Sequence, residues 1–422
     1  MAIQELEIHG FRSLRSAVWK PGPLNLVLGS NGSGKSNLLR LLELIADAAR
    51  GKLQDAIPRF GGMVPLLWDN QEGRFGWRLT IEPVDAERDR VRDALTFEME
   101  IGQGRGGSGY QIEKDTLANW VDFNEHTVQS PYWIFRRDFA AAELYDQNQQ
   151  KLVNAREILE LDLAESLLSQ IVDSRNSIPV LARRKIGHWA IHHDILVERN
   201  SRIRRPATTQ YVTRLDADGG NLAGFLHTHY SRREFKDLID DGMRAGFGEQ
   251  FQELGFPPAA ASQIQLAVFW KSSSQAHVAQ DLSDGTLRFL FILAALADPD
   301  PPSLIAIDEP EAGLHPSMLP VIAEYAVAAS ERTQVVLTSH SPEFLDCFSS
   351  PAVTLCNWED GQSQLFALDP ERLNKWLARY RLGHMFTHGD LDALASPPVD
   401  DIPDLDARLE NAFDDGSDSR ND

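Results

Sequence analysis

Apolar residues follow two different spacings in the first part of the chain. Residues 1–14 alternate apolar and polar side chains as a strand does, and Leu24–Leu28 is an almost continuous apolar run. Beyond a loop rich in glycine and serine, leucines three and four residues apart continue to about Arg50, which predicts a helix. From Phe75 to about Ile112 the pattern is again that of strands separated by polar turns. We therefore expect a mixed β lobe that contains one long helix.

The middle of the chain, residues 132–256, is predicted to be mainly helical. In Leu152–Val172 the apolar residues are spaced three and four apart, as in an amphipathic helix. No heptad repeat is sustained and no internal repeat is found, so long coiled-coil arms are not expected. We interpret this segment as a helical insertion.

From Ile264 onward, strands and helices are predicted to alternate. Helices are expected from Thr286 and after Pro316, and two strongly apolar strands are expected at residues 303–307 and 333–340. Strands that are apolar on both faces are typical of a parallel sheet covered by helices on both sides. The predicted fold class is therefore α/β, with a parallel core sheet.

These patterns divide the chain into four segments. We expect an N-terminal lobe at residues 1–131, the helical insertion at 132–256, a C-terminal lobe at 257–396 and a tail at 397–422. The tail has many acidic residues and little to bury, so it is predicted to be disordered.

Composition narrows the class of protein. The net charge of −21 argues against a chain that coats nucleic acid with its whole surface, although it leaves room for a local basic patch. Two cysteines, Cys347 and Cys356, do not make a disulfide framework and indicate a reducing compartment. No apolar run is long enough to span a membrane. A cytoplasmic protein is expected.

The loop after Leu28 has the spacing of a phosphate-binding loop. Glycines let successive backbone N–H groups point at a phosphate, and the following helix presents its positive end. Lys35 is expected to reach the β- and γ-phosphates, and Ser36 to offer its hydroxyl to Mg²⁺. ATP and Mg²⁺ are the predicted cofactors. The predicted nucleotide-binding residues of the loop are Gly29, Ser30, Asn31, Gly32, Ser33, Gly34, Lys35, Ser36 and Asn37.

A second glycine pattern, Gly102, Gly104 and Gly107, formally satisfies the dinucleotide-binding fingerprint. That fingerprint has to open a helix, whereas a strand-like segment follows these glycines. A hairpin loop is therefore predicted instead.

Polar side chains follow the two apolar strands of the C-terminal lobe. Asp308 and Glu309 come directly after the first strand, at the edge where parallel sheets bind ligands. We expect Asp308 to hold Mg²⁺ together with Ser36, and Glu309 to polarise the attacking water. His340 follows the next strand and is expected to contact the γ-phosphate. The alternatives are a helix N-cap for the carboxylates and a purely structural role for the histidine.

Ser283 and Gly285 lie just before another predicted helix start, which is a second anion-binding helix end. One chain cannot easily direct two such ends at one γ-phosphate, but two chains arranged head to tail can. A homodimer or higher homo-oligomer is therefore predicted.

Taken in order along the chain, these motifs resemble those of ATP-binding-cassette ATPases of the structural-maintenance-of-chromosomes (SMC) and recombination-repair type. Within that class the sequence is similar to prokaryotic AAA family ATPases close to the overcoming-lysogenization-defect group. The resemblance covers residues 1–60 and 262–342, and the segment Arg381–Leu391 looks like the small tail of this ATPase group. It implies a P-loop NTPase fold of the ABC/SMC-head type.

The resemblance also implies roles for the motifs. The implied assignments are Gly29–Ser36 as Walker A, Leu282–Gly285 as the signature, Asp308 and Glu309 as Walker B, Glu311–His315 as the D-loop and His340 as the switch histidine, with Lys35, Glu309 and His340 catalytic. The glutamine loop of the family stays open among Gln54, Gln71 and Gln111.

A basic segment within this acidic chain is a candidate for DNA contact, and it surrounds Trp189. Its basic residues are Arg183, Arg184, Lys185, Arg199, Arg202, Arg204 and Arg205. A solvated helix face and loop is the alternative. Three histidines of the same segment have metal-like spacing on a predicted helix, but no acidic or cysteine ligand is placed to complete a site, so no metal is expected there. These are His188, His192 and His193.

The predicted function is an ATP-binding and ATP-hydrolysing dimer switch. The resemblance implies DNA sensing in bacterial antiphage defence or DNA repair, and control of a separate effector such as a nuclease or toxin, because no nuclease domain follows residue 342. Two alternatives stay open. One is a transporter-like ATPase that drives a membrane partner, and the other is an ATP-gated scaffold with slow turnover.

Overall fold

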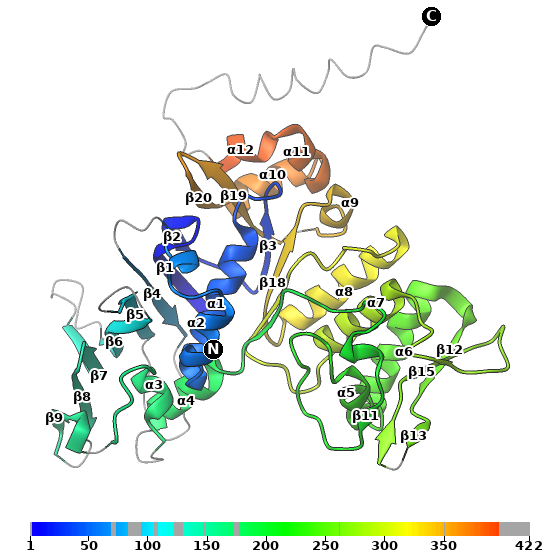
Figure 1. Ribbon diagram of the computed structural model, residues 1–422. Helices are drawn as coiled ribbons and strands as arrows, with labels where there is room; N and C mark the ends of the chain where they lie inside the picture. Colours follow the sequence, from blue (N-terminus) through cyan, green and yellow to red (C-terminus); the bar gives the residue numbers. More distant parts are fainter. Residues whose placement is uncertain are drawn as a thin grey trace, which may run out of the picture.

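The core of the protein is a six-stranded sheet with the strand order β10-β17-β18-β3-β19-β20 (Figure 1). The computed structural model describes residues 2–68, 73–82, 94–104, 109–121, 130–146, 149–157, 159–172, 177–260, 262–349 and 351–395. All neighbouring strands of this sheet are parallel except β19 and β20. The strands are β10 (Ala190–His192), β17 (Leu304–Ile307), β18 (Gln334–Ser339), β3 (Leu24–Leu28), β19 (Ala352–Glu359) and β20 (Gln362–Ala367). The predicted α/β class with a parallel core sheet is confirmed.

Apolar side chains on both faces of these strands explain why helices cover the sheet on both sides. Successive residues of a strand point to opposite faces. Accordingly, Val27 packs with α1 (Lys35–Arg50), whereas Leu26 belongs to a different buried cluster, formed with α7 (Asp284–Leu296) and α8 (Leu319–Ser330). Both side chains are fully buried, so each face of β3 contributes to a separate core.

A second, antiparallel sheet forms the lobe at the left of Figure 1. Within the described residues it has eight strands in the order β2-β1-β4-β5-β6-β7-β8-β9. They are β1 (Ile3–Phe11), β2 (Leu14–Trp19), β4 (Arg74–Ile81), β5 (Leu95–Gln103), β6 (Tyr110–Val121), β7 (Ser130–Asp138), β8 (Ala141–Asp146) and β9 (Lys151–Asn154). The predicted β character of the N-terminal lobe therefore extends well beyond residue 131.

The prediction of a helix over Leu152–Val172 is wrong. Strand β9, a 3-10 turn and the four-residue helix α3 (Leu167–Gln170) occupy this stretch. The reason is tertiary: Phe135, Leu144 and Val153 lie opposite one another on β7, β8 and β9 and form one buried row. Such cross-strand apolar pairs stabilise a sheet and override a helical spacing that is present only in the local sequence.

The remaining elements surround the two large sheets. Helices α5 and α6 and the small strands lie at the right of Figure 1, and α10–α12 lie at the top. The other helices are α2 (Leu53–Arg59), α4 (Ser177–Ile186), α5 (Leu222–His229), α6 (Arg233–Phe247), α9 (Pro342–Leu345), α10 (Pro370–Leu377), α11 (Leu382–His388) and α12 (Asp390–Ala395). The small strands are β11 (Ala207–Thr208), β12 (Phe251–Gly255), β13 (Pro258–Ala260), β14 (Gln263–Ile264), β15 (Ala267–Trp270) and β16 (His277–Val278). Helices α4, α5 and α6 all fall in the segment predicted to be mainly helical.

The glycine pattern near residue 102 is confirmed as part of a hairpin. Strands β5 and β6 pair up to Gln103 and Tyr110, so Gly102 lies in a strand and opens no helix. Gly107 and the predicted disordered tail lie outside the described residues.

Candidate nucleotide-binding site

The phosphate loop connects the end of β3 to the start of α1. Gly32 and Gly34 have φ angles of 83° and 110°, a left-handed backbone that favours glycine. At Gly29, a Cβ atom would come within 2.3 Å of the Cys356 carbonyl oxygen on β19, so a larger residue does not fit there. The loop conformation therefore depends on the glycines that define the motif.

Beside this loop lies a pocket of about 430 Å³. It is lined by Asn31, Gly32, Gly34, Lys35, Ser36, Asn37, Arg40 and Glu309. Lys35 Nζ donates to the carbonyl oxygens of Gly29 at 2.7 Å and Ser30 at 3.1 Å, so its ammonium group lies against the loop. The Ser33 side chain is buried, and its hydroxyl has no hydrogen-bond partner among the described residues. Six of the nine predicted loop residues thus line this pocket, whereas Gly29, Ser30 and Ser33 are not part of its lining.

Asp308 and Ser36 meet at the carboxyl ends of β17 and β3. Ser36 Oγ donates to Asp308 Oδ2 at 2.9 Å, and the Thr338 hydroxyl donates to the other carboxylate oxygen. Burial alone would raise the pKa of Asp308, but the nearby His193 imidazole and these two hydroxyl groups outweigh it and lower the pKa. A carboxylate kept ionised beside a hydroxyl is an oxygen ligand set of the kind that Mg²⁺ prefers.

Glu309 and His340 are in direct contact. The Nδ1 atom of His340 lies 3.0 Å from Glu309 Oε1, and both side chains are partly exposed toward the same side of the sheet. Glu309 has a φ of 45°, and its carbonyl oxygen accepts a hydrogen bond of 3.0 Å from Arg288 of α7. The strained backbone and its anchors fix the carboxylate beside the phosphate loop. The structure therefore brings Lys35, Glu309 and His340 to one edge of the sheet.

His193 also belongs to this site, although no role for it follows from the sequence pattern. Its Nδ1 lies 3.8 Å from Asp308 Oδ2, and its Nε2 lies 3.6 Å from Glu43 Oε2. Neither ring nitrogen has a hydrogen-bond partner among the described residues. The expected helix under the three histidines is wrong, because His192 lies in β10, which pairs with β17. A three-residue strand is too short to produce a readable alternation.

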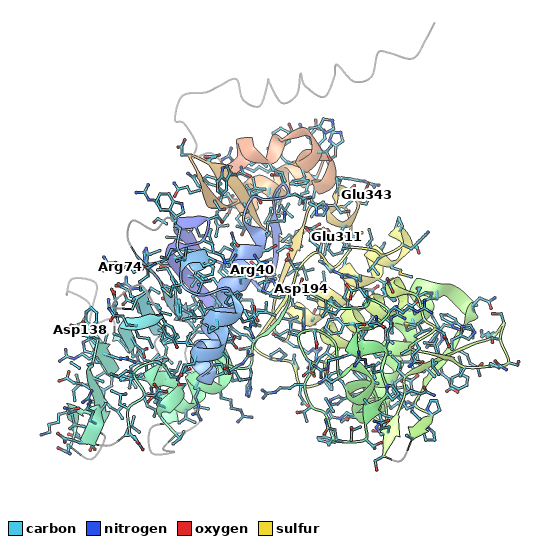
Figure 2. All side chains as sticks on the ribbon, in the orientation of Figure 1. Arg40, Arg74, Asp138, Asp194, Glu311 and Glu343 are labelled. Carbon is cyan, nitrogen blue, oxygen red and sulfur yellow. The ribbon has the colours of Figure 1, made fainter. Side chains whose placement is uncertain are left out.

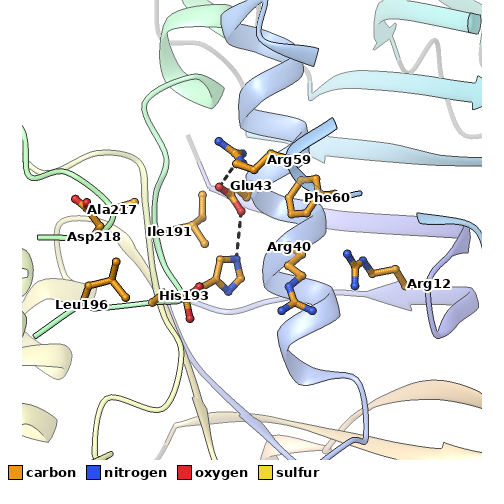
Figure 3. A pocket seen from close by; sticks show the side chains of 11 residues that line it. Arg12, Arg40, Glu43, Arg59, Phe60, Ile191, His193, Leu196, Ala217 and Asp218 are labelled. Atoms are coloured by element: carbon orange, nitrogen blue, oxygen red, sulfur yellow. Dashed lines mark hydrogen bonds and ion pairs between the residues drawn. The ribbon is translucent and has the colours of Figure 1, made fainter. Parts of the chain in front are cut away.

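A second pocket of about 470 Å³ lies next to the phosphate loop, and Arg40 lines both (Figure 3). Figure 3 shows Arg12, Arg40 and His193 on its wall, and Figure 2 shows Arg40 and Asp194 near the middle of the molecule. Arg12 has a φ of 50°, lies over the Phe60 ring and has an Nε atom without a partner in the described part of the chain. Burial and the charge of Arg40 lower its pKa. Three carboxylates, from Glu43, Asp194 and Asp218, line the same pocket, so its arginines are balanced by acidic side chains.

The signature residues lie apart from the pocket at the phosphate loop. Ser283 Oγ accepts a hydrogen bond from Thr286 N at 3.1 Å and so caps α7. A Cβ atom at Gly285 would lie 3.0 Å from the carbonyl oxygen of Gly313, in the predicted D-loop of the same chain. Neither Ser283 nor Gly285 lines the pocket of about 430 Å³. Within one chain, the two predicted phosphate-binding helix ends do not meet.

Arg204 holds the signature loop and is not available to DNA, which corrects the prediction for this residue. Its side chain is only 5 % exposed. Nη1 donates to the carbonyl oxygens of Leu282 at 2.6 Å and Ala279 at 3.0 Å, and Nη2 donates to the Asp284 carboxylate. An arginine from outside the motif therefore positions the motif.

The other predicted DNA contacts differ in their surroundings. Arg202 is paired with Asp216 and Asp218, each at 3.4 Å. Arg183 and Arg205 donate to backbone carbonyl oxygens, whereas Arg184 and Lys185 are exposed at the end of α4. The basic segment is thus not one continuous surface.

The two glutamine candidates that the structure describes, Gln54 and Gln111, do not line the nucleotide pocket. Gln54 lies in α2 and donates to Asp162 at 2.9 Å, and Gln111 pairs within the antiparallel sheet. Gln71 lies outside the described residues. The side chain that lies beside Asp308 is instead that of His193, the residue directly after β10.

A family model described as "AAA domain, putative AbiEii toxin, Type IV TA system" matches residues 24–346. This match spans the phosphate loop, the signature, the Asp308–Glu309 pair and His340. The chain belongs to this AAA family. None of the curated proteins compared with the chain matches it.

Solved structures of SMC heads resemble this AAA protein. An Smc head bound to the C-terminal winged-helix domain of ScpA is 12% identical, covers 89% of this chain and 100% of its own, and has a TM-score of 0.54. The SMC head domain from Thermotoga maritima is 13% identical over 87% of this chain and 100% of its own, with a TM-score of 0.42. An Smc head from Pyrococcus furiosus is 11% identical over 89% of this chain and 98% of its own, with a TM-score of 0.48. At these identities the first structure shows that the fold is that of an SMC head.

The residues of this AAA protein fit the cofactors that the family implies. At Gly32 no atom lies within 4 Å of the position that a Cβ atom would take, so the loop faces open space there, and Lys35 supplies a charge for phosphate oxygens. Ser36 and Asp308 would hold Mg²⁺ through oxygen atoms. Among the residues that the structure describes, no helix has both the length and the apolar character needed to cross a membrane.

Proposed function

We propose that this AAA protein hydrolyses ATP at sites formed between two copies of the chain. Lys35 and the loop amides hold the β- and γ-phosphates, and Glu309 polarises the attacking water. His340, 3.0 Å from Glu309, orients that carboxylate and reaches the γ-phosphate. Ser36 and Asp308 would hold Mg²⁺, which when bound would supply positive charge against the phosphate oxygens.

The observation that carries this proposal is the separation of the signature from the phosphate loop within one chain. Ser283 caps α7 with its N-terminus exposed beside the D-loop, away from the pocket that holds Lys35. Such a helix end can bind the γ-phosphate held by a second copy. Because the nucleotide would then contact both chains only when they are closed, ATP binding favours the closed dimer and hydrolysis opens it.

The biological role that we propose is DNA sensing in defence or repair. The family description names a toxin of a type IV toxin–antitoxin system, which favours a defence role over general metabolism. The related Smc head is bound to a domain of another protein, so a separate effector is a reasonable partner for this head. Arg184 and Lys185 remain exposed for contact with DNA.

A mixing experiment tests the shared site. Lys35→Ala disables the phosphate loop, and Ser283→Arg blocks the signature, so each variant alone should lose ATP hydrolysis. In a mixed dimer, the intact loop of one chain faces the intact signature of the other. Since half of the dimers are mixed and each has one working site of two, about a quarter of the wild-type rate should return.

The control is a mixture of Lys35→Ala with Glu309→Gln, both in the phosphate-loop half of the site. This mixture leaves no complete site in any dimer, so activity should not return. If the first mixture stays as inactive as the control, the shared site is wrong, and hydrolysis would have to occur within one chain.

A further inference from the structure

A third pocket lies at the end of α1 that is remote from the phosphate loop. It has a volume of about 470 Å³ and is enclosed by parts of α1, α4 and β10 and by the segments around residues 214 and 301. Four basic side chains line it, namely Arg50, Arg184, Lys185 and Arg214. This basic pocket therefore concentrates positive charge in a chain whose net charge is −21.

The side chain of His188 lies among the positive charges of the basic pocket. Burial and the charges of Arg214 and Arg184 lower its pKa to about 4, so the ring is neutral at pH 7. Arg214 Nη2 donates to His188 Nδ1 at 2.7 Å, which leaves the proton of the ring on Nε2. The neutral ring therefore adds another N–H donor to the four cationic side chains.

Acidic side chains in the basic pocket only partly balance this charge. Asp298 and Asp300 also line it, but Asp300 is paired at 3.2 Å with Arg232, which does not line the pocket. The side chains of Arg184 and Lys185 have no hydrogen bond or ion pair within the part of the chain that the structure describes. Two cations are thus available to an incoming anion.

The position of Arg50 is fixed by the wall of the pocket. Its Nε donates to the carbonyl oxygen of Gly187 at 2.6 Å, and its Nη2 donates to that of Trp189 at 2.9 Å. Its Nη1 is paired with Asp47 at 3.0 Å. The guanidinium is therefore rigid, and Arg184, Lys185 and Arg214 are the side chains that can move to meet a ligand.

Two elements run from the basic pocket to the nucleotide site. Helix α1 begins with Lys35 and ends with Arg50; its 16 residues span about 24 Å. Strand β10 begins in the pocket and is followed by His193, 3.8 Å from Asp308. In Figure 1, α4 lies beside the end of α1, and these two helices pack together. A ligand in the basic pocket would thus touch elements that also build the nucleotide site.

We propose that the basic pocket binds a phosphate monoester, such as the 5′-phosphate of a nucleic-acid strand end or of a free nucleotide. Guanidinium groups recognise phosphate oxygens through paired hydrogen bonds, and a monoester carries more charge than the diester of a strand interior. The volume suits a nucleotide-sized group and excludes a duplex. Of the proposed function, this inference rests on the DNA-sensing role and not on ATP hydrolysis.

The test measures binding without ATP, so that it does not depend on hydrolysis or dimer closure. The probe is a single-stranded oligonucleotide with a 5′-phosphate and a dye at its 3′ end, followed by fluorescence anisotropy at fixed salt. The same oligonucleotide with a 5′-hydroxyl should bind about tenfold more weakly, because the charge-assisted hydrogen bonds to the phosphate are lost. Cytidine 5′-monophosphate is the competitor that represents a free nucleotide.

Charge-reversal variants locate the site. Arg184→Glu and Arg214→Glu should each weaken binding of the phosphorylated probe about tenfold or more. Arg205→Glu is the matched control, since Arg205 belongs to the same basic segment, is exposed and does not line the pocket. Circular dichroism of each variant checks that it is folded.

Each outcome decides the proposal. Displacement of the probe by cytidine monophosphate supports the site with a free nucleotide as the source, and a phosphate-dependent probe that resists the nucleotide supports a strand end. Equal binding of the two oligonucleotides, or equal weakening by Arg205→Glu and Arg184→Glu, overturns it. If the wild-type protein binds the probe but does not hydrolyse ATP, the proposed function is refuted and the binding site in the basic pocket is not.

Discussion

The phosphate loop and the basic segment from Arg183 to Arg205 are both readable in the sequence, but in the structure only the residues of the loop gather around one pocket. In the loop, the side chain of Lys35 and the backbone of the glycines act on one neighbouring pocket. In the basic segment, Arg204 supports the signature loop, Arg202 is paired with acids, and Arg184 lines a separate pocket. A motif that works through its own backbone is local, whereas the role of a charged side chain depends on what the rest of the chain places around it.

The histidines of the basic segment show the same dependence. His188 lies among arginines, His192 is buried in β10 with its Nδ1 3.2 Å from the Ala217 carbonyl oxygen, and His193 faces Asp308. Their spacing resembles that of metal ligands, yet the strand turns the neighbours His192 and His193 to different surroundings. Their spacing in the sequence therefore does not predict the surroundings of the three histidines.

The largest expected effect tests the loop side of the comparison. Glu309→Gln removes the carboxylate that polarises water and should lower the rate of ATP hydrolysis about a thousandfold. The affinity for a fluorescent ATP analogue should stay within about twofold of the wild-type value, because the phosphate contacts come from the loop. Glu343→Gln is the control, since Glu343 is an exposed carboxylate on α9. Wild-type turnover by Glu309→Gln would contradict the assigned role.

The next effect separates two arginines of the basic segment. Arg204→Ala leaves several buried carbonyl oxygens without a donor and should lower the free energy of unfolding by about 3 kcal/mol. Arg205→Ala, at the neighbouring exposed position, should change it by less than about 0.5 kcal/mol. Urea denaturation followed by circular dichroism measures both. Similar values for the two variants would mean that Arg204 does not anchor the signature loop.

A smaller effect is expected at His193, where the basic segment reaches the nucleotide site. His193→Ala removes an imidazole next to Asp308 and should weaken Mg²⁺-dependent binding of a fluorescent ATP analogue on the order of tenfold. The Mg²⁺ concentration that gives half-maximal binding is the quantity to measure. His227→Ala, an exposed histidine on α5, is the control. An unchanged Mg²⁺ requirement would exclude His193 from the metal environment.

The smallest effect concerns Asp298 in the basic pocket. Burial raises its pKa to about 6 from 3.8, so the stability that the protonated group provides is present below pH 4 and is lost as the pH rises through 6. Asp298→Asn, which keeps an acceptor for the Asp300 N–H, should gain about 1 kcal/mol relative to wild type between pH 4 and pH 5. Urea unfolding at several pH values measures this. If the free energies of unfolding of wild type and Asp298→Asn change in parallel with pH, the pKa of Asp298 is not raised by the fold.

The antiparallel lobe shows where sequence patterns were misleading. The spacing of Leu152–Val172 favours a helix, but Val153 is buried in a row with Phe135 and Leu144 across three strands. The partners of Val153 lie 9 and 18 residues before it in the chain, so no local window contains the information.

The sequence by itself determined the parallel α/β core, the phosphate loop and the acids and histidine at the strand ends. It could do so because glycine spacing, runs of buried apolar residues and the chemistry at strand ends are local properties of the chain. Only the tertiary structure decided that His193 joins the nucleotide site, that Arg204 holds the signature loop and that Arg50 and Arg214 complete a basic pocket with Arg184. Those roles depend on burial and on charges from distant parts of the chain, which folding alone brings together.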